Sequence, residues 1–210
     1  MAVPAAIIGF LTGWLSAYLT ERVTPPEEAS PIRGQSMFVR DPLVQGALAI
    51  LWATIPLVIA GDNIVRWLEA GVMAVPLVQV AVTDLRTRYV YTVVAAVGLV
   101  LGLALGWHFH NVPWFWGPIG AVGGAVAFTA LYWIGKLIYR GGEPMARGDI
   151  TIAAMVGAGA AMCAAQALVW GVLLSGLLAI IFLVATRSRT AFMPYGPGLC
   201  LGGLATLFLC

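Results

Sequence analysis

Two aspartates stand where long apolar stretches meet polar turns, and this placement could support acid–base chemistry. Asp84 ends the stretch PLVQVAVTD, and Asp149 opens the stretch DITIAAMVGA directly after a glycine. Acids within a membrane are costly, and they generally face a cavity, a partner or a reaction. Two carboxyl groups about 4 Å apart, at an effective dielectric near 20, repel by about 4 kcal/mol. Such a pair shares one proton, so one carboxylate could activate water while the other binds a peptide carbonyl.

Each aspartate also has a simpler possible role. Asp149 could cap the helix that it opens, because free backbone N–H groups and the helix dipole favour a carboxylate there. Asp84 could form an ion pair with Arg86 or Arg88 at the membrane interface. The residues alone leave these alternatives open.

The composition indicates which elements must position the two acids. Of the 210 residues, 61% are hydrophobic and 10% are charged, which is typical of a membrane protein and not of a soluble domain. A net charge of +2 without a basic cluster argues against nucleic-acid binding. A spanning helix needs roughly 20 apolar residues. We therefore predict one all-α, polytopic membrane domain over residues 1–210, with a short cytosolic loop at 20–41 and about eight helices: 3–19, 43–60, 68–83, 90–108, 114–139, 150–170, 171–186 and 197–209.

Two features of this helix pattern matter for the site. No polar residue separates the sixth and seventh predicted helices, so seven helices remain an alternative. Of the eleven basic residues, only Arg66 falls in an even-numbered loop. Because basic residues favour the cytoplasmic side, we expect both termini outside and both aspartates near the cytoplasmic face.

The glycine-rich segments GPIGAVGGAVAF and GAGAAMCAA predict close helix packing.

The cysteines and histidines form no recognisable metal or disulfide pattern. Cys163, Cys200 and Cys210 lie singly in apolar stretches, so we expect small buried side chains and neither a disulfide nor a zinc site. His108 and His110 lie in the aromatic segment GWHFHNVPWFW. We expect them to be interfacial polar residues, because the sequence shows no third ligand near them.

Five stretches, in order along the chain, resemble the type IV prepilin peptidase family of GxGD-type membrane aspartic proteases. The first two are GFLTGWLSAYLTERV and VRDPLVQGALAILWA. DLRTRYVYT, from Asp84, resembles the family's Asp-containing stretch. ARGDITIAAMVGA resembles its Gly-x-Gly-Asp motif and the helix after it, and MPYGPGLCLGG resembles its terminal Pro-Phe-Gly-Pro segment.

The resemblance implies catalytic roles for Asp84 and Asp149. It implies supporting roles for the residues that match the two short motifs: Gly148 and Ala146 in the first, and Pro194, Gly196 and Pro197 in the second. The implied activity is cleavage of short basic leader peptides from prepilin or pseudopilin precursors at the cytoplasmic face of the bacterial inner membrane. The partners are those precursors and the lipid bilayer, and no cofactor is expected.

The departures from the family pattern limit the expected activity. Ala146 replaces a glycine, Thr151 stands where lysine is common, and Tyr91-Thr92 replace the usual Pro-Asn. The loop at 20–41 contains no cysteine. Members that also methylate the new N-terminus carry a longer insert there, often with two zinc-binding Cys-x-x-Cys pairs. We therefore expect neither methyl transfer nor zinc or S-adenosylmethionine binding.

Two other functions remain open. One is a small channel or transporter in which the two aspartates pass protons or cations. It requires polar residues across the bilayer, and the sequence offers few besides Gln166 and Ser175. The other is an inactive scaffold for pilus assembly, in which loss of either aspartate would be harmless.

Overall fold

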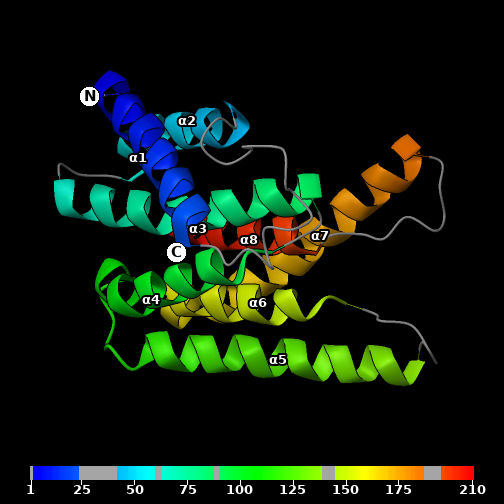
Figure 1. Cartoon of the computed structure of the whole chain (residues 1–210). Coiled ribbons are helices and arrows are strands. Elements are labelled where there is room, and N and C mark those ends of the chain that lie inside the picture. The colour runs from blue at the N-terminus through cyan, green and yellow to red at the C-terminus, as the bar shows by residue number, and fades with distance from the viewer. Residues whose placement is uncertain (1, 24–41, 60–62, 88–89, 139–144, 187–194) are drawn as a thin grey trace.

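The computed structural model describes residues 2–23, 42–59, 63–87, 90–138, 145–186 and 195–210. The described residues form no strand, which confirms the all-α prediction. Within them the chain forms eight α-helices and one short 3₁₀ turn (Figure 1): α1 (Ala2–Val23), α2 (Pro42–Val58), α3 (Ile64–Thr87), α4 (Thr92–Phe109), α5 (Trp116–Ile138), α6 (Arg147–Ala160), the turn η2 (Ala161–Cys163), α7 (Ala164–Thr186) and α8 (Gly196–Leu209).

The predicted boundary between the sixth and seventh helices is wrong. Residues 164–186 form one continuous helix, and the break lies at η2 instead. There Ala161 adopts a φ of 47°, a backbone conformation that costs a residue with a side chain roughly 1–3 kcal/mol. The surrounding sequence AAMCAA contains neither glycine nor proline, so no local signal marks this break.

Four segments among the described residues are long and apolar enough to cross a membrane. They are residues 64–85, 92–109 and 116–138, and the stretch 147–181 that runs from α6 into α7. Helices α2 and α8 and the first part of α1 are apolar but shorter. The structure therefore supports a membrane protein, while the number of eight spans stays a prediction.

The helices pack in an order that places α8 in the interior. Helix α3 packs against α8, and α8 in turn packs against α6 and α7. The pair α1 and α2 lies on one side of this group and α5 lies on the other (Figure 1). Helix α4 completes the bundle through contacts with α3 and α6.

Glycines allow three of these helices to approach closely, as the sequence predicts. A Cβ on Gly120 or Gly124 of α5 would collide with the backbone of α6 at Gly157 or Ala153. A Cβ on Gly106 of α4 would meet the α6 backbone in the same way. Small residues at such contacts are typical of helix association in lipid.

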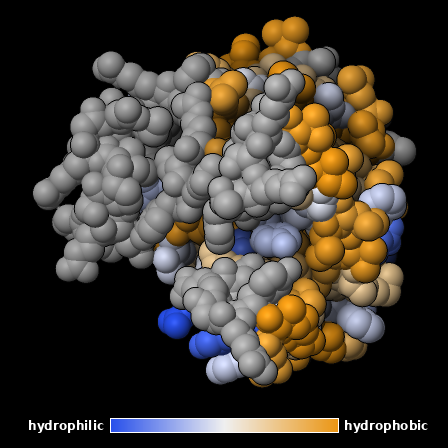
Figure 2. Space-filling model, turned by 90° about the vertical axis from the view of Figure 1, so that its right-hand side faces the viewer, coloured by the Kyte–Doolittle hydropathy of each residue, from blue (hydrophilic) through white to orange (hydrophobic). Residues whose placement is uncertain are grey.

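The outer surface of the bundle suits a bilayer. Viewed from the end where α3 ends and α6 begins, hydrophobic residues cover much of the described surface (Figure 2). Helices α5 and α7 contribute many exposed large apolar side chains, among them Ile119, Val122, Val126, Trp133, Leu137, Val169, Leu173, Leu177, Ile180 and Val184. An apolar surface this extensive on a water-soluble monomer would be unusual.

One prediction about the cysteines is wrong and one is confirmed. Cys163 and Cys210 are joined by a disulfide that links η2 to the end of α8. Cys200 is a free thiol and is fully buried, as expected. No local sequence pattern indicates this pairing, because the two cysteines are 47 positions apart and meet only through helix packing.

Candidate active site

Asp84 lies near the end of α3, and its side chain is buried, with 5% of the residue exposed. The backbone N–H of Gly196, at the start of α8, donates a hydrogen bond to its carboxyl group. The carboxyl oxygen Oδ2 is also buried, and it has no hydrogen-bond partner in the part of the chain that the structure describes. The backbone of Gly196 therefore holds the carboxyl group, while Oδ2 is buried without a hydrogen bond from the described residues.

Asp149 occupies the first turn of α6 and is 3% exposed. Its backbone N–H donates to the carbonyl of Ala146, and the backbone of Ala146 hydrogen-bonds its carboxyl group in return. An acid three residues after the N-cap that reaches back to the N-cap backbone is the second half of a capping box. The capping role considered from the sequence is therefore real, and it also fixes the orientation of the carboxyl group.

The two acids meet at one end of the bundle. Asp84 lies close enough to Asp149 for its charge to act on that residue, and both acids act on the thiol of Cys200. The meeting follows from the packing, since α3 and α6 both contact α8 and its first turn lies between them. The structure thus brings together the two aspartates that the sequence singled out. The side chain of Arg86 and the whole of Arg88 lie outside the described residues, so the predicted ion pair with Asp84 stays untested.

Gly196 at the start of α8 packs directly against Asp84. A Cβ at this position would collide with Oδ2 of Asp84 and would lie 3.0 Å from the side chain of Ile152. Any side chain here would displace the carboxyl group or tilt α8. Glycine is therefore required for the observed approach of α8 to α3.

A hydroxyl group on α7 supports the start of α8. The Ser175 hydroxyl is buried and lies 2.9 Å from the carbonyl oxygen of Tyr195, the residue directly before Gly196. It also lies 2.8 Å from the carbonyl of Gly171 on its own helix. A serine hydroxyl bonded in this way fixes the turn that presents the Gly196 N–H to Asp84.

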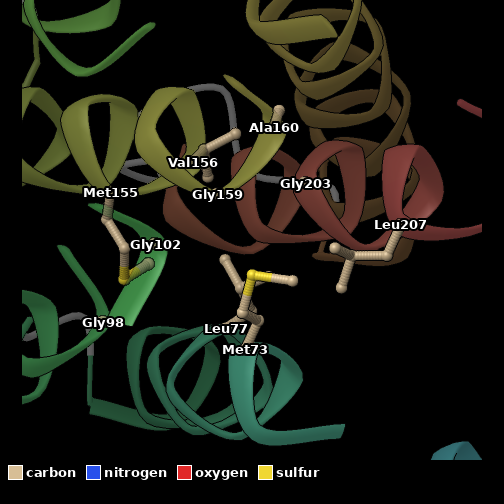
Figure 3. Close-up of a pocket in the computed structure, with 10 residues that line it drawn as sticks. All are labelled: Met73, Leu77, Gly98, Gly102, Met155, Val156, Gly159, Ala160, Gly203 and Leu207. Carbon is tan, nitrogen blue, oxygen red and sulfur yellow. The ribbon is translucent and has the colours of Figure 1, made fainter. Parts of the chain in front are cut away.

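An interior gap between α3, α4, α6 and α8 is not a substrate site. It measures about 10 Å³, and every side chain that lines it is apolar (Figure 3): Met73, Leu77, Gly98, Gly102, Met155, Val156, Gly159, Ala160, Gly203 and Leu207. A gap of this size holds one water molecule at most, and an apolar lining offers water no partner.

Comparison of the sequence with known proteins identifies the family of this chain. A sequence model of the type IV leader peptidase family matches residues 71–184, which is more than half of the chain. The matched segment contains both aspartates. The chain belongs to the type IV leader peptidase family.

One relative shows the same relationship over a longer stretch. The chain is 27% identical over 150 residues to a protein of Escherichia coli O78:H11 (strain H10407 / ETEC) named "Type 4 prepilin-like proteins leader peptide-processing enzyme". The similarity covers 68% of this chain and 54% of the relative, so the chain spans about half of that protein's length. No solved structure matches the chain.

The remaining residues predicted from the leader peptidase motifs differ in how close they lie to the acids. Ala146 and Gly148 both precede Asp149 in the chain. A Cβ on Gly148 would lie 3.2 Å from Val90, which is tight but without a collision. Pro197 is fully buried in the first turn of α8, where a fixed φ suits a helix start. Pro194 lies outside the described residues.

Two residues near the aspartates, Ser175 and Cys200, have no site role among the predictions from sequence. Ser175 was considered only as part of a transport path, and Cys200 only as a small buried side chain. A buried serine inside an apolar helix was a usable signal, because such a hydroxyl requires a partner. For Cys200 the sequence offered no signal, since its proximity to the acids depends on how α8 packs.

Proposed function

We propose that this chain is an aspartic endopeptidase that removes leader peptides from type IV prepilin or pseudopilin precursors. The observation that carries the proposal is the pair of buried carboxyl groups, Asp84 and Asp149, at one end of a membrane bundle of the leader peptidase family. The name of the Escherichia coli relative supports the substrate class. No nucleophilic side chain is needed for this chemistry.

In the proposed reaction the two carboxyl groups share one proton. The ionised group takes a proton from a water molecule, and the water oxygen attacks the carbonyl carbon of the scissile peptide. The protonated group donates its hydrogen bond to the carbonyl oxygen and stabilises the tetrahedral intermediate. The proton taken from water then passes to the leaving nitrogen, and the C–N bond breaks.

The two acids have environments suited to this division of work. Asp149 is bonded to the backbone of Ala146 and Asp84 to that of Gly196, so both carboxyl groups are oriented before substrate binds. Oδ2 of Asp84 has no hydrogen-bond partner in the described part of the chain, and we assign this atom to the contact with water or with the substrate carbonyl. Groups held in place in this way contribute to rate without reorganising during the reaction.

The finer features of the proposal concern topology and chemistry. We place the chain in the bacterial inner membrane as one domain over residues 1–210, with its termini outside and the aspartates facing the cytoplasm. The distribution of basic residues supports this orientation. We expect no methyl transfer to the new N-terminus, because the loop at 20–41 contains no cysteine.

The transporter alternative receives less support from the described residues. Gln166 is exposed on the bundle surface, and the Ser175 hydroxyl is bonded to two backbone carbonyls. Neither residue extends a polar path from the two acids across the bundle. We therefore do not favour proton or cation transport as the function.

The proposal is tested with the full chain, purified in detergent, and a synthetic precursor that joins a short basic leader to an apolar helix. Mass spectrometry of the products should show one cut at the junction between the leader and the apolar helix. With S-adenosylmethionine present, the new N-terminus should keep its unmethylated mass. If several prepilin-like precursors stay intact while a related leader peptidase cuts them under the same conditions, the proposed activity is wrong.

A further inference from the structure

Three side chains that the peptidase site does not use meet at the opposite end of the bundle. Cys163 follows α6 in the turn η2, Cys210 follows α8, and His110 follows α4. Helices α6 and α8 begin at the aspartates, so their far ends bring the two cysteines together. One ring nitrogen of His110 and the two sulfur atoms lie within 4.8 Å of one another. This corrects the expectation that His110 has no potential co-ligands nearby.

The positions of the two cysteines suit a pair of thiols as well as the disulfide. Their Cα atoms are 6.6 Å apart, near the long end of the range for disulfides. Two thiolates on one tetrahedral zinc ion, each with a Zn–S bond of about 2.3 Å, lie roughly 3.8 Å apart. Side-chain rotation at this Cα spacing can bring the sulfurs to that separation without moving the helices.

The imidazole of His110 is arranged like that of a metal-binding histidine. Its ring is hydrogen-bonded to the backbone of Gly159, while Nε2 is buried and has no partner among the described residues. Histidines that bind metals generally use one nitrogen for the ion and donate the other N–H to a carbonyl or carboxylate. The second bond fixes the ring before the ion arrives.

The backbone on both sides of this cluster is unusual. Among the described residues, only Asn111 and Ala161 have positive φ without being glycine, at 54° and 47°. Asn111 directly follows His110, and Ala161 lies two residues before Cys163. Strained backbone persists where the surrounding structure requires it, and it concentrates at functional sites. Here the two positive-φ residues border two of the three side chains.

We propose that Cys163, Cys210 and His110 form a redox-gated zinc site. In the state that the structure shows, the S–S bond occupies both sulfurs and no metal can bind to them. A dithiol reductant supplies two electrons and two protons, cleaves the S–S bond and becomes a disulfide itself. The two thiols then lose their protons to solvent and bind one Zn²⁺ together with the imidazole of His110.

The donor set determines the class of cation. Two thiolates and one imidazole favour Zn²⁺ over hard cations such as Mg²⁺ and Ca²⁺. Three protein ligands leave the fourth tetrahedral position open to water or to an exogenous ligand. Cys163 is buried and Cys210 is exposed at the bundle surface, so an ion could reach the site from the Cys210 side.

The test uses the full chain in detergent, reduced with a phosphine that is then removed, and Zn²⁺ as the probe. After buffer exchange, elemental analysis should find one zinc per reduced chain and none on the oxidised chain. Titration against a coloured zinc chelator gives the affinity. Co²⁺ in place of Zn²⁺ should give the thiolate-to-cobalt charge-transfer band that only sulfur ligands produce.

Two variants separate a metal site from a simple disulfide. Replacing His110→Asn should weaken zinc binding by at least about tenfold, whereas His108→Asn should leave it unchanged. His108 is the matched control because it lies two residues away and contacts Glu69 instead. Cys163→Ser should abolish binding. The proposal fails if the reduced chain binds no stoichiometric zinc, or if the two histidine variants bind zinc equally well.

Discussion

At the scale of single residues, the geometry of Asp84 depends on one backbone contact. The N–H of Gly196 holds the carboxyl group, and the absence of a Cβ allows α8 to come this close. A hydrogen bond to an ionised carboxylate is stronger than one between neutral groups, more so away from bulk water. The position of Asp84 should therefore be more sensitive to Gly196 than to any other glycine near the site.

We predict that Gly196→Ala lowers the rate of leader cleavage by roughly 10- to 100-fold, because the new methyl group displaces the Asp84 carboxyl group. Gly148→Ala should have a smaller effect, since its Cβ would lie 3.2 Å from Val90 without a collision. Gly176→Ala on α7 is the control, as its Cβ would meet no atom within 4 Å. Steady-state kinetics measure the cleavage rates of the three variants and so give the order of their effects. Equal rates for Gly196→Ala and Gly176→Ala would contradict the contact described here.

The sequence identifies the two aspartates as candidate site residues, but it does not predict which residues contact them. Asp84 and Asp149 are conspicuous because a charge at the edge of an apolar helix demands an explanation. The contact of Gly196 with Asp84, and that of Cys163 with Cys210, join residues far apart in the chain. Such contacts are set by helix packing, which the local pattern of residues does not encode.

At the scale of the elements, α5 and α6 lie in backbone contact through glycines. Gly124 faces the α6 backbone at Ala153, while its neighbour Gly123 faces open space. Long apolar stretches in the sequence predict the helices. Glycines spaced along α5 and α6 predict that these helices pack closely against a neighbouring helix. The exact helix ends are less predictable, as the break at η2 shows, because Ala161 is forced into its conformation by tertiary packing.

Adjacent substitutions on α5 test this packing. We predict that Gly124→Val destabilises the protein by about 1–3 kcal/mol, because the added side chain has to push α5 away from α6. Gly123→Val adds the same side chain where a Cβ would meet no atom within 4 Å, and it should change stability little. Denaturant titration of both variants, followed by tryptophan fluorescence, measures the difference. Similar stabilities would show that the two helices are not in close contact.

At the scale of the whole molecule, the orientation in the membrane determines which compartment the site faces. Composition alone predicts an all-helical membrane protein, and the structure agrees. The direction of insertion depends on basic residues near the ends of the helices, because loops that carry them tend to stay on the cytoplasmic side while the chain inserts. The distribution of basic residues predicts that both aspartates lie at the cytoplasmic ends of their helices.

Fusion reporters test this orientation in cells. Alkaline phosphatase is active only outside the cytoplasm, so a fusion after Cys210 should be active. A fusion after Ile138, at the end of α5, should be inactive. A fluorescent protein that folds only in the cytoplasm should give the reverse pattern at both positions. An active phosphatase after Ile138 would mean that the aspartates face the outer side.

The most direct test of the proposed mechanism is the rate of leader cleavage by purified wild type, Asp84→Asn and Asp149→Asn. Asparagine keeps the size of the side chain but cannot share a proton. Glu69→Gln is the matched control, because Glu69 is a buried acid bound to His108 and away from the pair. The mechanism predicts that both aspartate variants fold normally and lose roughly 10²- to 10⁴-fold in rate, while Glu69→Gln cleaves like wild type. Cleavage at the wild-type rate by either aspartate variant would contradict it.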